Sequence, residues 1–150
     1  MPSPIGELLL TAADGRLTGL YLPVEVHGPP AGMARDDGAF VTVRRQLEEY
    51  FAGERRAFDL PVAPRGTAFQ QLVWNELQRI GYGDTITYSE LAARVGRPTA
   101  IRAAGAANGR NPVSIIIPCH RVIGSSGSLT GYSGGLDAKR ALLDLERSPQ

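Results

Sequence analysis

Residues 87–108 read TYSELAARVGRPTAIRAAGAAN, and this stretch indicates the fold more clearly than any other part of the chain. Thr87, followed by a glutamate three positions later, forms a capping-box pattern, which starts a helix because the two side chains bond to free backbone N–H groups. Gly96 ends this helix, and Pro98 suits the first turn of a second one, expected to run to Asn108. Two short helices joined by a tight glycine turn predict a helix-turn-helix.

The second of these helices, expected over Thr99–Asn108, consists mostly of alanine and glycine, and Arg102 is its only charged residue. Small residues give a helix a low profile that can lie against a nucleic-acid backbone. They also allow two helices to pack closely, which is the commoner meaning of such a composition. The pattern alone leaves both interpretations open.

A further helix is expected upstream, after the linker-like residues 64–66. Thr67 and Gln70 form its capping box, and Gly81 stops it. Its buried stripe is expected to comprise Phe69, Leu72, Val73, Leu77 and Ile80.

The N-terminal part combines strands with one helix. Residues 5–12 and 17–22 are predicted strands, joined by an Asp-Gly hairpin turn. A helix is expected over residues 40–52, and a short edge strand is expected around residues 58–62.

We therefore predict an α/β (α+β) fold in two parts: a small N-terminal sheet-and-helix scaffold over residues 1–64 and a mainly helical subdomain with the helix-turn-helix over residues 65–150. The first part carries six Arg against nine Asp and Glu, a net charge of −3, and the second carries ten Lys and Arg against six acidic residues, a net charge of +4. No acidic residue falls between Leu91 and Leu136. Such a basic stretch indicates a polyanion partner, although a solvated basic face gives the same pattern.

Composition narrows the class of protein. No run of about 18 apolar residues is present, so no transmembrane helix is expected, and the N-terminus lacks the pattern of a secretory signal. The cytoplasm, including the nucleoid, is the expected location. The single cysteine excludes an internal disulfide, and with only two histidines in the chain no structural zinc site is expected.

The chemistry is expected at Cys119. Residues 115–117 are three isoleucines, a pattern typical of a buried extended segment, and Pro118 then ends any strand pairing, so the cysteine falls at a turn. A free thiol has a pKa of about 8.5 and needs a base to become a nucleophile, and His120 is adjacent. Glu146 on the C-terminal helix is the candidate that orients the imidazole, unless it is an ordinary exposed helix charge. An inert buried thiol is the alternative for the cysteine.

Residues 117–123, IPCHRVI, resemble the active-site signature of the O6-alkylguanine-DNA alkyltransferases, also called methylated-DNA–protein-cysteine methyltransferases. The resemblance includes Asn111-Pro112 upstream and GYSGGL at residues 131–136 downstream. It also includes the starts of both capping-box helices, in the family's order and spacing, and so spans roughly residues 67–147. The N-terminal third matches only loosely.

The resemblance implies that Cys119 accepts the alkyl group from O6-alkylguanine in double-stranded DNA, with O4-alkylthymine as a second candidate lesion. The transfer would be irreversible, so each molecule would act once, as a suicide enzyme, without cofactor or metal. His120 would act as the base through a water, with Glu146 behind it, and Asn111 would hold the active turn. The guanine pocket would be lined by Tyr88, Val122, Tyr132, Ser133 and Gly134, the last leaving room for larger alkyl groups.

The resemblance also implies that the damaged nucleotide flips out of the duplex, because its reacting atom is buried in the base stack. Arg102 would fill the vacated space, Tyr88 would push the target phosphate, and the small-residue helix would lie in the minor groove. A monomer is expected on DNA, and cooperative binding stays open. The candidate DNA contacts are Arg102, Tyr88, Ala103, Ala106, Asn108, Arg110 and Arg121.

Two other classes of function stay open. A thiol hydrolase can use the pair Cys119 and His120, but it would turn over and would need an oxyanion hole. A DNA-binding or damage-recognition module without catalysis would need the helices but not the cysteine.

Overall fold

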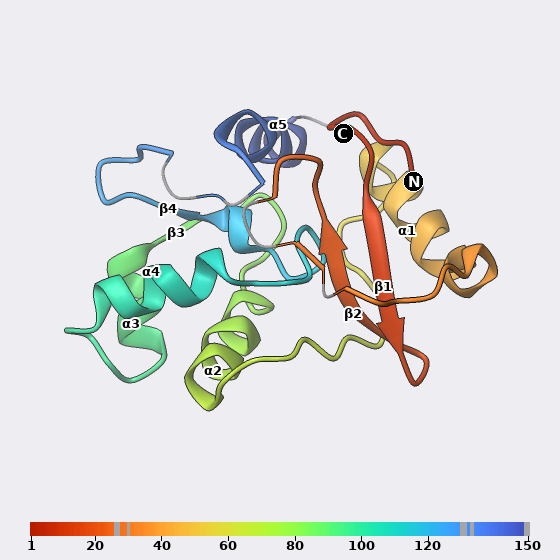
Figure 1. The fold of residues 1–150 in the computed structure, drawn as a ribbon. Coiled ribbons are helices and arrows are strands. Elements are labelled where there is room, and N and C mark those ends of the chain that lie inside the picture. The colour runs from red at the N-terminus through yellow and green to blue at the C-terminus, as the bar shows by residue number, and fades with distance from the viewer. Residues whose placement is uncertain (26–27, 30, 130–131, 133, 149–150) are drawn as a thin grey trace.

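The computed structural model describes residues 1–25, 28–29, 31–129, 132 and 134–148 (Figure 1). The elements, in chain order, are β1 (Leu9–Ala13), β2 (Arg16–Tyr21), the 3₁₀ helix η1 (Asp37–Phe40), α1 (Val41–Phe51), α2 (Ala68–Leu77), β3 (Ile86–Thr87), α3 (Tyr88–Arg94), α4 (Ile101–Gly109), the 3₁₀ helix η2 (Cys119–Arg121), β4 (Val122–Ile123) and α5 (Leu136–Arg147). A hairpin and one helix precede a mainly helical part, so the predicted fold class is confirmed.

The N-terminal hairpin pairs β1 with β2 in antiparallel register. Asp14 and Gly15 form its turn with φ of 53° and 76°. A two-residue turn with both φ values positive matches the twist of the strands, which is why the Asp-Gly signal predicted it. The first strand is shorter than expected, because it begins at Leu9 rather than at Ile5.

The outer edge of β2 holds two later segments of the chain. Leu17 forms a bridge with Val62, and Leu20 forms one with Val113. The Leu20 N–H donates to the Pro112 carbonyl at 2.8 Å. The expected edge strand around residues 58–62 is therefore reduced to a single bridge. The hairpin also supports the segment that leads to the cysteine.

The two capping boxes are confirmed. The hydroxyl of Thr67 accepts from the Gln70 N–H at 3.2 Å at the start of α2, and that of Thr87 accepts from the Glu90 N–H at 3.1 Å at the start of α3. The next helix, α4, begins later than expected. Residues 97–100 form a turn instead, closed by the hydrogen bond from the Ala100 N–H to the Arg97 carbonyl.

The three isoleucines at 115–117 are largely buried, but the expectation of an extended segment is wrong. Ile115 has a φ of 72°, a left-handed conformation that β-branched residues rarely adopt. The Ile117 N–H bonds back to the Val113 carbonyl at 3.0 Å, so the segment forms a turn. A β-branched run favours a strand locally, and here burial of Ile115 and Ile117 in the core overrides that preference.

One hydrophobic cluster extends through both parts of the chain. In Figure 1, α1 lies on one side of the hairpin and α2, α3 and α4 lie on the other. Trp74 of α2 is buried and donates from Nε1 to the Ala107 carbonyl of α4 at 2.8 Å, which ties these two helices together. No helix among the described residues is long and apolar enough to cross a membrane.

The prediction for α2 differs from the structure in two respects. The helix ends at Leu77 rather than just before Gly81, so Ile80 is buried beyond its end. The second difference sets up a matched test. Leu77 is fully buried, whereas Leu72 is 50% exposed. Leu77→Ala should lower the free energy of unfolding by about 2–5 kcal/mol, because it leaves a cavity. Leu72→Ala should change it by less than about 0.5 kcal/mol. Urea unfolding followed by circular dichroism measures both, and equal losses would contradict the packing of α2.

Candidate active site

The turn η2 places three consecutive residues inside the protein. Cys119, His120 and Arg121 are all buried. Directly after them, β4 pairs in parallel with β3, which leads into α3. This pairing brings the cysteine turn next to the start of α3, although about thirty residues separate them in the sequence.

Two buried asparagines hold the cysteine turn. Asn111 donates from Nδ2 to the Ile117 carbonyl at 2.8 Å, and its Oδ1 accepts from the Val113 N–H at 3.0 Å. Asn108 donates from Nδ2 to the Cys119 carbonyl at 3.3 Å. The side chain of Asn108, a candidate DNA contact, therefore points inward and is bonded to the backbone of the cysteine.

The imidazole of His120 is completely buried, and its Nε2 lies 2.7 Å from Glu146 Oε2. Burial by itself raises the pKa of Glu146, but hydrogen bonds from His120 and Arg121 outweigh it and hold that pKa well below its usual range. An ionised carboxylate can only accept, so Nε2 carries the proton and Nδ1 is the basic nitrogen. Nδ1 has no hydrogen-bond partner within the described part of the chain.

The electrostatics around His120 keep the imidazole neutral. Burial lowers its pKa, and the charges of Arg121 and Lys139 act in the same direction, while Glu146 opposes them. A neutral imidazole with a free Nδ1 can take up a proton, which is the property required of a base.

Arg121 has a structural role that the sequence analysis missed. Its Nε donates to Glu146 Oε1 at 2.8 Å and its Nη2 to Oε2 at 2.9 Å. Its Nη1 donates to the Ile80 carbonyl at 2.6 Å. The guanidinium of this candidate DNA contact is therefore buried, and each of its three nitrogens donates a hydrogen bond inside the protein. A bidentate arginine offsets much of the cost of burying a carboxylate.

The Cys119 thiol is held in its protonated form in this environment. Burial raises its pKa to about 11, while a hydrogen bond from the Asn111 side chain and the charge of Lys139 act against this, and Glu25 adds to it. The thiolate is the nucleophile, so the thiol must lose its proton as it reacts. The neutral imidazole of His120 follows it directly in the chain.

Lys139 of α5 is a second residue that the sequence analysis missed. Its Nζ lies 3.5 Å from the Tyr88 hydroxyl and 5.7 Å from the centre of that ring. Burial lowers its pKa to about 8, and the proximity of Cys119 opposes this. The amine is thus mostly cationic at neutral pH and can stabilise a thiolate. Lys139 is the only lysine in the sequence, and this was a signal that could have pointed to it.

The expected pocket residues lie around the cysteine turn where the structure describes them. Val122 and Tyr132 are buried, and the Tyr132 hydroxyl has no hydrogen-bond partner within the described residues. Gly134 does not leave open space, because a Cβ there would lie 2.9 Å from Leu22 Cδ2 and from the Tyr132 ring. Ser133 lies outside the described residues.

The exposed face of α4 presents Arg102, Ala103 and Ala106, three of the candidate DNA contacts, and Arg110 follows at the end of the helix. The opposite face is packed: Ala104 and Ala107 are buried. Small side chains therefore allow close packing on one face of α4 and leave few protruding side chains on the other face.

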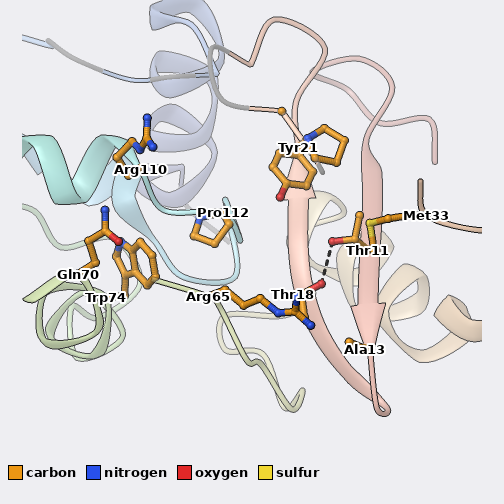
Figure 2. Close-up of a pocket in the computed structure, with 12 residues that line it drawn as sticks. Thr11, Ala13, Thr18, Tyr21, Met33, Arg65, Gln70, Trp74, Arg110 and Pro112 are labelled. Carbon is orange, nitrogen blue, oxygen red and sulfur yellow. Dashed lines mark hydrogen bonds between the residues drawn. The ribbon is translucent and has the colours of Figure 1, made fainter. Parts of the chain in front are cut away.

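An open cleft beside the hairpin is separate from the cysteine. A cleft of about 370 Å³ lies between β2 and α2, with Arg65 and Arg110 in its lining. Figure 2 shows these arginines with Tyr21 and Trp74 around it. Neither Cys119 nor His120 lines this cleft, so the buried turn and not the open cleft is the candidate site. Among the described residues, no group of His, Cys, Asp and Glu could hold a metal ion.

Comparisons with known proteins agree along the whole chain. Residues 68–148 match the family described as 6-O-methylguanine DNA methyltransferase, DNA binding domain, and residues 1–64 match its ribonuclease-like domain. The methylated-DNA–protein-cysteine methyltransferase of Mycobacterium bovis is 51% identical over 152 residues, which cover 97% of this chain and 89% of the relative. That of Methanosarcina acetivorans is 49% identical and is covered to 95%.

A solved structure supports the same assignment. The crystal structure of Mycobacterium tuberculosis OGT in complex with DNA matches with a TM-score of 0.93 at 50% identity, covering 98% of this chain and 90% of that one. Because both family domains and relatives of about 50% identity cover nearly the whole sequence, the chain belongs to the 6-O-methylguanine DNA methyltransferase family.

Proposed function

We infer that this protein repairs alkylated DNA by moving the alkyl group of O6-alkylguanine onto Cys119. This proposal rests on the arrangement of three buried residues. Cys119 is followed in the chain by His120, whose Nε2 lies at hydrogen-bond distance from Glu146 and whose Nδ1 has no hydrogen-bond partner among the described residues. Relatives of about 50% identity are named methylated-DNA–protein-cysteine methyltransferases. The same site is proposed to accept O4-alkylthymine as a second lesion.

The free Nδ1 of His120 and its bonded Nε2 support the following proton and electron movements. His120 Nδ1 takes the thiol proton of Cys119, directly or through a water, while its Nε2–H remains bonded to the Glu146 carboxylate. The thiolate attacks the alkyl carbon, a carbon–sulfur bond forms, and the carbon–oxygen bond breaks with its electron pair going to O6. The departing guanine anion then gains a proton. The thioether is stable, so each chain reacts once.

Lys139 contributes charge to this step. Its ammonium stabilises the thiolate before attack and lies against the Tyr88 hydroxyl, which is proposed to face the purine. A cation held at this place in a buried site acts more strongly than it would in water.

DNA binding is proposed for α3 and α4, which together resemble a helix-turn-helix. Arg102, Ala103 and Ala106 form the contacting face, with Arg102 filling the space of the flipped nucleotide and Tyr88 near its phosphate. A related chain from Mycobacterium tuberculosis was crystallised with DNA, which supports this assignment. Residues 65–150 would thus form the DNA-binding and reacting subdomain, and residues 1–64 its scaffold.

Mass spectrometry of the intact protein tests the reaction. Incubation with duplex DNA that contains O6-methylguanine should add one methyl group per chain, located on Cys119, and then stop. The variant Cys119→Ser should gain no mass, because a serine hydroxyl is far less nucleophilic, yet should bind DNA with unchanged affinity. Continued release of methyl into solution would instead identify a thiol hydrolase, and DNA binding without any transfer would identify a recognition module.

A second prediction separates flipping from chemistry. Arg102→Ala should slow repair of duplex DNA about 10- to 100-fold, the rate equivalent of a few kcal/mol for unstacking a base. Reaction with the free base should change by less than about twofold, because no stack must be opened. Arg79→Ala removes an exposed arginine from the turn that follows α2 and serves as the control. Equal losses on both substrates would rule out the flipping role.

The pKa of His120 makes a third prediction about pH. Because burial lowers this pKa, the imidazole should stay neutral, and the single-turnover rate at saturating DNA should change by less than about twofold between pH 6 and pH 7.5. A base with the ordinary pKa of about 6.5 would lose roughly fourfold over that interval as it protonates. Rapid-quench measurements decide between them, and a midpoint near pH 6.5 would contradict the buried environment.

A further inference from the structure

Tyr50 links the N-terminal part of the chain to the reacting residues. It lies on α1, is fully buried, and donates from its hydroxyl to Glu146 Oε2 at 2.6 Å. The two residues are 96 positions apart in the sequence. Packing against Phe51 and Phe58 accounts for the ring of Tyr50, but a phenylalanine ring would fill the same space without the hydroxyl.

The hydroxyl of Tyr50 shares one oxygen with the imidazole. Glu146 Oε2 accepts from Tyr50 at 2.6 Å, from His120 Nε2 at 2.7 Å and from Arg121 Nη2 at 2.9 Å. Each donor draws on the same negative charge. The more of that charge Tyr50 and Arg121 engage, the less is left to stabilise a proton on the imidazole.

The surroundings keep Tyr50 in place as a permanent donor. The rings of Phe51 and Phe58 lie 5.3 Å from its ring, and that of Tyr82 lies edge-on at 6.2 Å. Burial and the charge of Glu146 raise the pKa of Tyr50 far above its ordinary value, so its hydroxyl stays protonated.

Every element around the carboxylate contributes a polar or charged group. The groups that face Glu146 or the imidazole are Tyr50 from α1, Tyr82 and the Gly83 N–H from the segment after α2, His120 and Arg121 from η2, and Lys139 from α5. Arg56 stacks on Tyr82 at 5.4 Å. Among them, Tyr50 is the neutral side chain that bonds directly to the oxygen shared with the imidazole.

We propose that Tyr50 is a positioning residue for alkyl transfer, which holds Glu146 and limits its charge so that His120 remains a neutral base. The proposal rests on the proposed function. The Tyr50 hydroxyl acts through Glu146 on the imidazole of His120, which receives the thiol proton. By this route the N-terminal part of the chain contributes to the chemistry.

The variant Tyr50→Phe tests this by removing the hydroxyl and keeping the ring. The carboxylate should then hold the imidazole proton more strongly, and the pKa of His120 should rise by about 0.5–1 unit. The pH at which the single-turnover rate is halved should therefore rise by the same 0.5–1 unit relative to wild type, so the rate should fall more at pH 6 than at pH 7.5, because the base is protonated at the lower pH. A purely structural role would reduce the rate equally at both pH values.

Tyr82→Phe is the matched control. It removes a hydroxyl from the same aromatic cluster, one that bonds to the Leu145 carbonyl and not to the carboxylate. This variant should leave both the pKa of His120 and the shape of the pH profile unchanged. An equal shift in the two variants would overturn the proposal, since it would show a general effect of the cluster.

A nitrogen-15 NMR titration reads the imidazole directly, without any alkyl transfer. The chain has two histidines, so His27→Gln leaves His120 as the only signal. An unchanged pKa of His120 in the folded Tyr50→Phe protein would disprove the proposal. Failure of alkyl transfer in the wild type would instead count against the proposed function, and the titration would still test Tyr50.

Fluorotyrosine incorporated at position 50 covers the case in which the phenylalanine variant does not fold. It keeps the shape of the ring and makes the hydroxyl a stronger donor, so the pKa of His120 should fall below the wild-type value. A rise or no change would overturn the proposal.

Discussion

The carboxylate of Glu146 is the point on which the reacting part of the molecule depends. It is buried, and a buried carboxylate without partners costs several kcal/mol. Here α1, η2 and the segment after α2 all supply donors to it, the closest of them at 2.6 to 2.9 Å. The same contacts that make the charge tolerable also orient His120. Glu146 therefore couples the packing of α1 against α5 to the tautomer of the His120 imidazole.

The cysteine depends on a second set of constraints, which act on the backbone. Asn111 and Asn108 bond to carbonyls on either side of the turn, and the edge of β2 pairs with the segment before it. These bonds hold Ile115 in a conformation that its side chain disfavours, and burial of the neighbouring isoleucine compensates. The cysteine turn is thus held by the two asparagines and by pairing of the preceding segment with β2, rather than by the strand that a run of isoleucines suggests.

Local signals in the sequence were dependable where the physics is local. The capping boxes at Thr67 and Thr87 and the Asp-Gly turn involve residues within three positions of one another, so a short stretch carries all the information. Errors arose where distant segments compete for a residue. Leu72 fits the apolar period of its helix, yet half of it stays exposed. Arg121 and Asn108 are residue types typical of DNA contacts, but their side chains bond to buried groups.

The sequence by itself determined the α/β class, the hairpin turn, the helix starts and the candidate chemistry of Cys119, His120 and Glu146. Residue type and short-range spacing decide the helix starts and the turn, since backbone capping and turn conformation need only nearby atoms. A lone cysteine followed directly by a histidine is itself a residue-level signal of a thiol nucleophile. Tertiary structure alone decided that Tyr50, Arg121 and His120 meet on one carboxylate, that Lys139 lies against Tyr88, and that Gly134 is closely packed. These contacts join residues up to 96 positions apart, and no local pattern records which buried groups a folded chain will bring within hydrogen-bond distance.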